Sequence, residues 1–525
     1  MTLLDVTIVN IAIPSMMSGL VASLDEILWV INAYVIMLAV LVITTGRLGD
    51  MRGQRKMFML GIAVFTASSL ACGLAPGPAA LIAARVAQGV GAAILLPQTS
   101  ALLITTFPPH KRGAAFGIWG AVGGAATVAG PTLGGLLVTV GDWPWIFFVN
   151  IPIGVLVFVM AWQIIPERGR RAQRSLDLPG VLLASVALVC VTFALVEGER
   201  FGWGQVWKFV SIPALLVVGV VLSAVFLLVQ ARRQQHEPLI PFTLFGDRNY
   251  SIMNGVAALV SIAMIGTFLP VTIYLQDVLE FSALEAGLTM APLSGMSLLV
   301  SPFAGRLTDR IGGKFILMSG LSLFGGGITG FLLVASADAT WSVFLPWLLV
   351  AGFGLGCLFA PMNTVAMRNV RDTVAGAASG VLNTTRQMGQ VMGSAVVGAV
   401  LQSRLSASLH AEAIDAATEL PSPEREPFVQ SFSRAAEGGL QVSAGQDGID
   451  IALPPGVPEE VVRKIGEMAH DVFVQGYVDA MKATLIVPIA SVACGAVLCL
   501  AVKRRRTGRG ASGEGVGAGT TSHAD

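Results

Sequence analysis

Long apolar runs recur along the chain and are separated by short polar segments. Most runs hold roughly 18 to 25 residues without a charge, the length at which an α-helix crosses a hydrocarbon core about 30 Å thick. The pattern therefore predicts an all-α integral membrane protein with about fourteen transmembrane helices. The expected spans lie near residues 1–20, 27–45, 57–75, 79–106, 113–137, 144–165, 178–196, 209–230, 250–275, 284–304, 315–334, 341–366, 374–400 and 483–502.

Composition supports a membrane location and excludes a soluble globular chain. Of the 525 residues, 54% are hydrophobic and 12% are charged, whereas about 25% of an ordinary soluble domain is charged. The net charge of +1 gives no reason to expect nucleic acid as a partner. The five cysteines lie in apolar runs, where a thiol packs as a small hydrophobe, and their spacing indicates neither disulfides nor a metal site.

One long polar stretch, residues 402–475, separates the last two expected spans. It is rich in Ser, Glu, Asp and Pro, a composition that predicts a loosely ordered middle. Its end, from Pro458 to Phe473, has the periodicity of an amphipathic helix.

Lysine and arginine concentrate in every second loop, and this asymmetry marks the cytoplasmic side of a membrane protein. If the loop 46–56 is cytoplasmic, the other inner loops also hold basic clusters, whereas the short outer loops hold only Arg200 and Lys208. We therefore expect a multi-pass protein of the cell (inner) membrane with both termini in the cytoplasm and residues 402–475 outside.

An internal repeat divides the chain. The segment Gly46-Arg-Leu-Gly-Asp50-Met-Arg-Gly53 returns as Gly305-Arg-Leu-Thr-Asp309-Arg-Ile-Gly312, each time after the second span of a six-span half. Two related halves around a midplane site are how many secondary transporters are built. The predicted units are 1–165 (six helices), 166–248 (two inserted helices and linkers), 249–502 (six helices) and the basic, Gly-rich tail 503–525.

Both copies resemble the loop between helices two and three of the major facilitator superfamily. An Asp at a helix end among arginines can form a charge-assisted latch that breaks and re-forms as two halves rock; simple anchoring by positive charge is the alternative. Met51 and Gln54 stand where the family often has Arg, which predicts a weaker latch. The expected latch residues are Asp50, Arg52, Gly53, Asp309, Arg310 and Gly312.

Further motifs resemble the fourteen-helix drug:proton antiporter family of that superfamily. The resemblance covers residues 1 to about 400 and 475 to 502, and implies a 6+2+6 major facilitator fold that exchanges drugs for protons. The motifs are Leu4-Asp5-Val-Thr7-Ile-Val-Asn10, Trp29-Val-Ile-Asn32-Ala-Tyr34, Arg85-Val-Ala-Gln88-Gly89, Gly130-Pro131-Thr-Leu-Gly134-Gly135, Trp145-Ile-Phe-Phe-Val-Asn150 and Asn383-Thr-Thr-Arg386-Gln-Met-Gly389.

Two charged residues inside spans are the candidates for proton coupling. Arg85 shares a helical face with Gln88 and Gly89, and an intramembrane arginine is a functional candidate unless it only bonds carbonyls. The family resemblance assigns its position to proton coupling. Asp5 is the one carboxylate placed inside a span, so we expect it to carry the proton. Because Asp5 lies close behind Met1, we expect either a start upstream or an unusually short first helix.

Other segments suggest exchange and substrate binding. In the family, Gly130, Pro131, Gly134 and Gly135 form the antiporter motif, and the proline predicts a bend; ordinary helix packing explains the glycines equally well. The substrate-cavity candidates are Asn10, Asn32, Tyr34, Gln88, Asn383, Arg386 and Gln390. Some relatives carry an acidic residue near the last three, associated with dications; none stands here, so no strong preference for dications is expected.

The sequence lacks the motifs of enzymes and ATP-driven pumps. It has no G-x-x-x-x-G-K-[ST], H-E-x-x-H or nucleophile elbow, so we expect no enzyme, no cofactor and no metal, with the proton gradient as energy source. The leading hypothesis is a monomeric proton-coupled exporter of amphipathic or hydrophobic compounds. The alternatives are a dedicated exporter of one metabolite, lipid precursor or siderophore, or a membrane enzyme or receptor, which would show clustered carboxylates or a folded outer domain.

Overall fold

The computed structural model describes residues 1–166, 177–198, 201–207, 210–235, 238–418, 420, 422–437 and 459–503. Within these ranges, eleven helical segments are long and apolar enough to cross a membrane. Each expected span falls on a helix or a pair of consecutive helices, so the predicted helical membrane fold is confirmed. The total of fourteen stays a prediction.

The first half of the chain forms a helical bundle. Its first expected span is two helices rather than one, because Pro14, just inside the second helix, lacks the N–H that would continue the first. The elements are α1 (Thr2–Ile11), α2 (Ile13–Leu20), α3 (Leu24–Arg52), α4 (Gln54–Gly73), α5 (Pro78–Thr106), η1 (Pro109–Lys111), α6 (Arg112–Gly141), α7 (Trp145–Phe148) and α8 (Asn150–Ile164).

The inserted segment is a helical hairpin. It consists of α9 (Leu178–Glu197), the short strands β1 (Gln205–Trp207) and β2 (Val210–Ser211), and α10 (Ile212–Arg232). Asp177 caps α9 and also accepts hydrogen bonds from Gln230 (2.7 Å) and Arg233 (2.9 Å) of the α10 end. The hairpin rests on the first bundle through α3, where the rings of Trp29 and Phe193 lie 5.9 Å apart.

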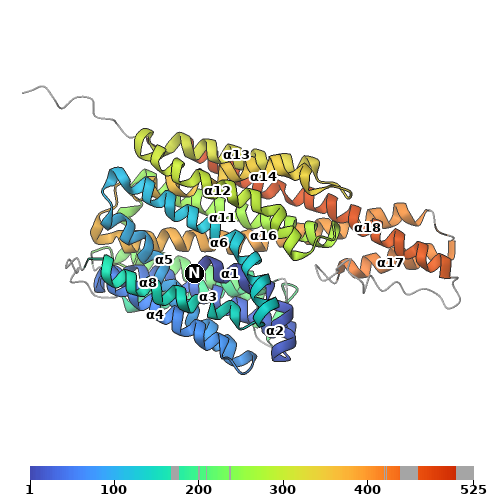
Figure 1. The fold of residues 1–525 in the computed structure, drawn as a ribbon, viewed down its shortest axis with the longest axis horizontal. Coiled ribbons are helices and arrows are strands. Elements are labelled where there is room, and N and C mark those ends of the chain that lie inside the picture. The colour runs from blue at the N-terminus through green and yellow to red at the C-terminus, as the bar shows by residue number, and fades with distance from the viewer. Residues whose placement is uncertain are drawn as a thin grey trace, which may run out of the picture.

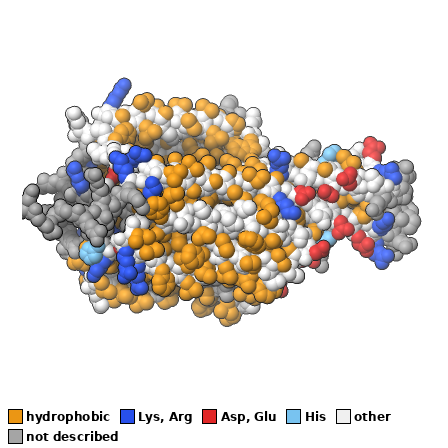
Figure 2. Space-filling model, turned by 90° about the horizontal axis from the view of Figure 1, so that it is seen from above, with side chains coloured by type: hydrophobic (Ala, Val, Ile, Leu, Met, Phe, Trp, Pro, Cys, Tyr) orange, Lys and Arg blue, Asp and Glu red, His pale blue; other side chains and the backbone are white. Residues whose placement is uncertain are grey.

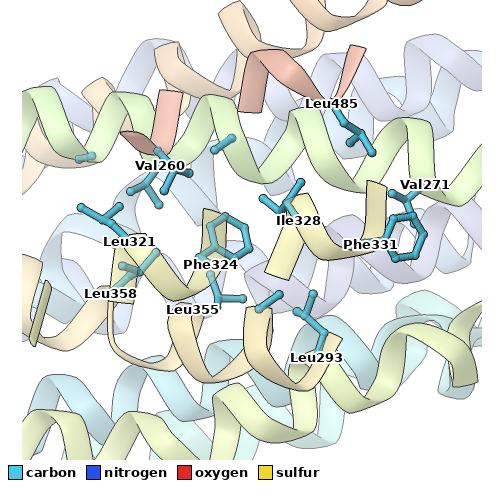
Figure 3. Close-up of a cluster of buried hydrophobic side chains, with 14 of the residues drawn as sticks. Val260, Val271, Leu293, Leu321, Phe324, Ile328, Phe331, Leu355, Leu358 and Leu485 are labelled. Carbon is cyan, nitrogen blue, oxygen red and sulfur yellow. The ribbon is translucent and has the colours of Figure 1, made fainter. Parts of the chain in front are cut away.

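The second half repeats the bundle around an apolar core, part of which is drawn in Figure 3: Phe324, Ile328 and Phe331 of one helix and Leu355 of the next belong to it, and Phe324 lies beside Leu355. Its elements are η2 (Phe242–Leu244), α11 (Arg248–Ile273), η3 (Tyr274–Val278), α12 (Ala283–Ile311), α13 (Gly313–Val334), α14 (Trp341–Gly356), α15 (Phe359–Ala366), η4 (Asp372–Val374), α16 (Ala375–Ala417), α17 (Ser422–Glu437), α18 (Glu459–Thr484) and α19 (Ile486–Leu500).

The polar stretch 402–475 is more ordered than its composition predicts. Helix α16 continues without a break to Ala417, and α17 and α18 fold beside its end to form an extension that projects from the bundle (Figure 1). Leu409, Phe428, Phe432 and Tyr477 are fully buried there. The loose order expected for the middle of this stretch is not found at 422–437, whereas the amphipathic helix expected from Pro458 to Phe473 falls on α18. Residues 438–458 and the tail 504–525 lie outside the described residues.

The surface matches a molecule that sits in a bilayer. In the face shown in Figure 2, hydrophobic side chains cover the middle of the bundle, and charged side chains gather at one end and on the extension. We call the end that carries Asp50 and Asp309 the latch end.

Candidate functional site

A buried ion pair lies inside the first bundle. Nη1 of Arg85 on α5 is 2.5 Å from Oδ2 of Asp5 on α1. The two side chains are 1% and 0% exposed, so water in this conformation does not reach them. The structure thus brings together the two residues that the sequence nominated for proton coupling.

Neutral donors complete the coordination of the Asp5 carboxylate. Its Oδ1 accepts hydrogen bonds from Nε2 of Gln88 (2.8 Å) and from Nδ2 of Asn150 on α8 (3.3 Å). Nε2 of Gln88 also donates to Oγ of Ser69 on α4 (2.7 Å), while its Oε1 accepts from Arg85 (2.7 Å). Helices α1, α5 and α8 therefore meet at one carboxylate, and α4 joins them through Gln88. A change in the charge of this carboxylate alters contacts with several helices at once.

Aromatic rings enclose the guanidinium of Arg85. Its Cζ lies 4.3 Å from the ring centre of Tyr34 and 5.8 Å from that of Phe147, and its Nε donates to the carbonyl of Val30 (3.0 Å). A cation over an aromatic face in a dry site is strongly stabilised. A carboxylic acid can bind and release a proton, whereas a guanidinium does not serve as a proton carrier, so the carboxylate of Asp5 is the candidate carrier of this pair.

The latch residue Asp50, at the end of α3, reaches into the other half of the molecule. Its two carboxylate oxygens accept hydrogen bonds from the backbone N–H groups of Gly376 (2.7 Å) and Ala377 (2.8 Å). These amides form the start of α16, where a helix leaves N–H groups unsatisfied and carries a partial positive charge. The carboxylate therefore caps a helix of the opposite bundle.

Asp309 makes the mirrored contact. From the end of α12 it accepts hydrogen bonds from the backbone N–H groups of Gly113 (2.8 Å) and Ala114 (2.9 Å), at the start of α6. Each half thus caps a helix of the other, which gives the repeated sequence motif a structural counterpart. The sequence suggested basic side chains as the latch partners; the backbone of the facing helix was not anticipated.

Glycines bring the two halves into backbone contact beside these caps. A Cβ on Gly46 would overlap the carbonyl oxygen of Gly376, and one on Gly305 would overlap that of Gly113. No residue with a side chain fits at these crossings without moving a helix. In this conformation the latch end is therefore closed.

The other four residues expected in the latch are two arginines and two glycines, and only the glycines shape the turns. Arg52 and Arg310 are exposed to solvent. Gly53 and Gly312 have φ angles of +100° and +89°, which residues with a side chain rarely adopt, and they let α4 and α13 start immediately after α3 and α12 end.

Comparison with known proteins agrees with this geometry. The family model described as Major Facilitator Superfamily matches residues 1–394. The chain belongs to the Major Facilitator Superfamily. It is therefore a multi-pass membrane protein of a transporter family.

Relatives of the protein include antibiotic-resistance proteins. It is 32% identical to the tetracenomycin C resistance and export protein of Streptomyces glaucescens, over 91% of this chain and 85% of the relative. It is 36% identical to the multidrug resistance protein Stp of Mycobacterium tuberculosis, over 78% of this chain and 75% of the relative. A bacterial homologue of the iron transporter ferroportin, in an outward-facing state, shares the fold with a TM-score of 0.55 at 13% identity and covers 95% of this chain and 96% of its own.

The expected antiporter motif lies on α6. Gly130 and Gly134 are buried and Gly135 is half-buried. The helix runs without interruption from Arg112 to Gly141, so Pro131 does not break it. The side chain of Pro131 lies outside the described residues.

The expected substrate-cavity residues do not come together in one site in this structure. Tyr34 and Gln88 are fully buried and contact the Asp5–Arg85 pair. On α16, Asn383 donates to the carbonyl of its own helix at Ser379, and Gln390 is half-buried. Arg386 on the same helix contacts Asn363 and Phe359, and Asn32 lies against the inserted hairpin. The side chain of Asn10 is outside the described residues.

A second buried carboxylate escaped the sequence analysis. Glu197, the last residue of α9, is 1% exposed, and its Oε1 accepts a hydrogen bond from Nδ2 of Asn32 at 2.6 Å. Asp5 is therefore not the sole buried carboxylate of the spans. Glu197 was missed because the expected span ended one residue earlier and a polar Gly-Glu-Arg segment follows it. Only the packing of the hairpin on α3 brings it inside.

Proposed function

We propose that this protein is a proton-coupled secondary transporter that exports amphipathic or hydrophobic organic compounds. The buried Asp5–Arg85 pair supports the proposal most directly, because it holds a titratable carboxyl group away from water inside one half of the transporter. The relatives' names, which speak of export and resistance, support the same direction of transport.

The basic residues around the latch end support a cytoplasmic position for that end, with both termini inside. The closed latch then corresponds to a state shut toward the cytoplasm. Opening requires that Asp50 and Asp309 leave the helix starts that they cap and that the glycine crossings separate.

Proton exchange at Asp5 can drive the cycle. Burial penalises an ionised carboxylate, and the guanidinium of Arg85 compensates for that penalty. When Asp5 binds a proton, its attraction to Arg85 weakens, and the helices that meet at the carboxylate can rearrange. Proton entry from outside and release to the cytoplasm would thus alternate with export of substrate.

A dedicated exporter of one metabolite, lipid precursor or siderophore is the second candidate on the same fold. The extension is formed by α17, by the end of α16 and by the start of α18. Helix α16 begins inside the bundle, and α18 leads directly into α19 of the bundle. This continuity does not favour a separate receptor function for the extension. We expect a monomer that needs no cofactor.

An efflux panel in a strain that lacks its own pumps tests the proposal. Cells that express the protein should accumulate less of several unrelated amphipathic compounds, and an uncoupler that collapses the proton gradient should abolish the difference. Export of one compound only would support the dedicated exporter. Unchanged accumulation of all compounds would overturn the export function.

A further inference from the structure

Arg386 is a buried charge in the middle of the second bundle. It lies eleven residues after Ala375, the first residue of α16, which places it about 16 Å along the helix, near the centre of a hydrocarbon core about 30 Å thick. Its exposed fraction is 9%. A charge at this depth is costly unless a partner or water compensates for it.

The described partners of Arg386 are neutral. Its Nη2 donates to Oδ1 of Asn363 on α15 (2.9 Å), and its Cζ lies 5.8 Å from the ring centre of Phe359. Its Nε is buried without a hydrogen-bond partner. No carboxylate in the described part of the chain forms an ion pair with it. Arg85, by contrast, has Asp5 at 2.5 Å.

The surroundings of Arg386 lie where the two halves meet. A Cβ on Gly120 of α6 would sit 3.4 Å from Cβ of Phe359, so a helix of the first half lies close to Phe359. On α16 itself, a Cβ on Gly380 would lie 3.2 Å from Cα of Ile43 on α3. Midplane positions between the halves are where secondary transporters hold their substrates.

We propose that Arg386 and Asn363 recognise an anionic group of the substrate, so that the exported compounds carry an ionised acid such as a carboxylate on an aromatic or apolar body. The inference rests on the proposed export function and narrows its substrate class. A guanidinium offers a planar set of donors that matches a carboxylate. Asn363 is held in place because its Nδ2 donates to the carbonyl of Phe359 (2.7 Å), and the ring of Phe359 supplies an apolar face for the body of the ligand.

Matched acid and ester pairs test the charge requirement. Pyrene-1-carboxylate and its methyl ester differ in the anionic group but share the apolar body. In proteoliposomes with a pH gradient, the wild-type protein should export the acid, and Arg386→Gln should slow export of the acid by about tenfold to a hundredfold, as expected when a charge-assisted hydrogen bond is removed. Export of any ester should change little. Arg386→Lys, which keeps the charge without the planar fork, should recover part of the acid transport.

Arg404→Gln is the matched control, because Arg404 is an exposed arginine on the same helix; it should leave both rates unchanged. Equal loss of acid and ester transport in Arg386→Gln, with an unchanged unfolding temperature, would overturn the anion site, as would a wild-type preference for the ester. If the wild type exports neither these compounds nor any member of the efflux panel, the export function itself fails.

Discussion

Asp50→Asn is the sharpest perturbation of the latch. In the closed state both oxygens of Asp50 accept backbone hydrogen bonds at the start of α16, and the side chain is 7% exposed. An asparagine keeps one acceptor, turns an NH2 group toward the second N–H, and removes the charge that faces the helix dipole. Loss of one hydrogen bond to a charged group costs about 1.5–3 kcal/mol, and loss of the dipole interaction about 0.3–1 kcal/mol.

Together these losses amount to about 2–4 kcal/mol, which shifts the equilibrium between closed and open latch roughly 30-fold or more toward the open form. Spin labels on the starts of α4 and α16 would report this shift as a longer distance in double electron–electron resonance. Transport should slow, because the closed state is harder to reach, while substrate affinity stays nearly intact, because the latch lies away from the midplane.

Arg52→Gln is the control for Asp50→Asn. It removes a charge from the same loop, but Arg52 is exposed and the bonds of Asp50 to α16 remain. Its distance distribution should match that of the wild type. An unchanged distribution in Asp50→Asn, combined with a large loss of equilibrium substrate binding, would refute the latch assignment.

Three further changes address other contacts. Arg85→Lys keeps the charge but loses the planar fork, so the number of substrates exported per proton, measured in proteoliposomes, should fall; unchanged coupling would argue against the role of the fork. Glu197→Ala removes the oxygen that accepts the hydrogen bond from Asn32, so the free energy of unfolding, measured by thermal denaturation, should fall by about 1–3 kcal/mol. Glu197→Gln keeps an acceptor oxygen and should retain most of the wild-type stability. Gly305→Val should overlap the backbone at Gly113 and shift the latch end toward the open form in the double electron–electron resonance measurement; a wild-type distance distribution would contradict the glycine crossing.

The periodic features of the sequence predicted the helical fold well, because long apolar runs and repeated Gly and Asp positions report directly on spans and on related halves. The Asp5–Arg85 pair could also be anticipated, since charges inside spans are rare and costly. Their contact could not be derived from the sequence itself, because it depends on how α1 and α5 pack.

What the sequence did not predict depends on tertiary contacts. The partners of Asp50 are backbone amides, which carry no residue signature. Glu197 looks like a loop residue until the hairpin packs on α3. In the extension, polar composition suggested loose order, but Phe428 and Phe432 are fully buried and continue the apolar core of the second half.

Proton-driven efflux by Asp5→Asn tests the central claim most directly. The experiment compares purified wild-type and Asp5→Asn protein in proteoliposomes, and measures substrate transport both under an imposed pH gradient and as downhill exchange without one. The account predicts that the variant loses transport driven by the gradient but retains downhill exchange, because the asparagine cannot bind and release a proton. Wild-type rates of proton-driven efflux in Asp5→Asn would contradict it and place the coupling site elsewhere.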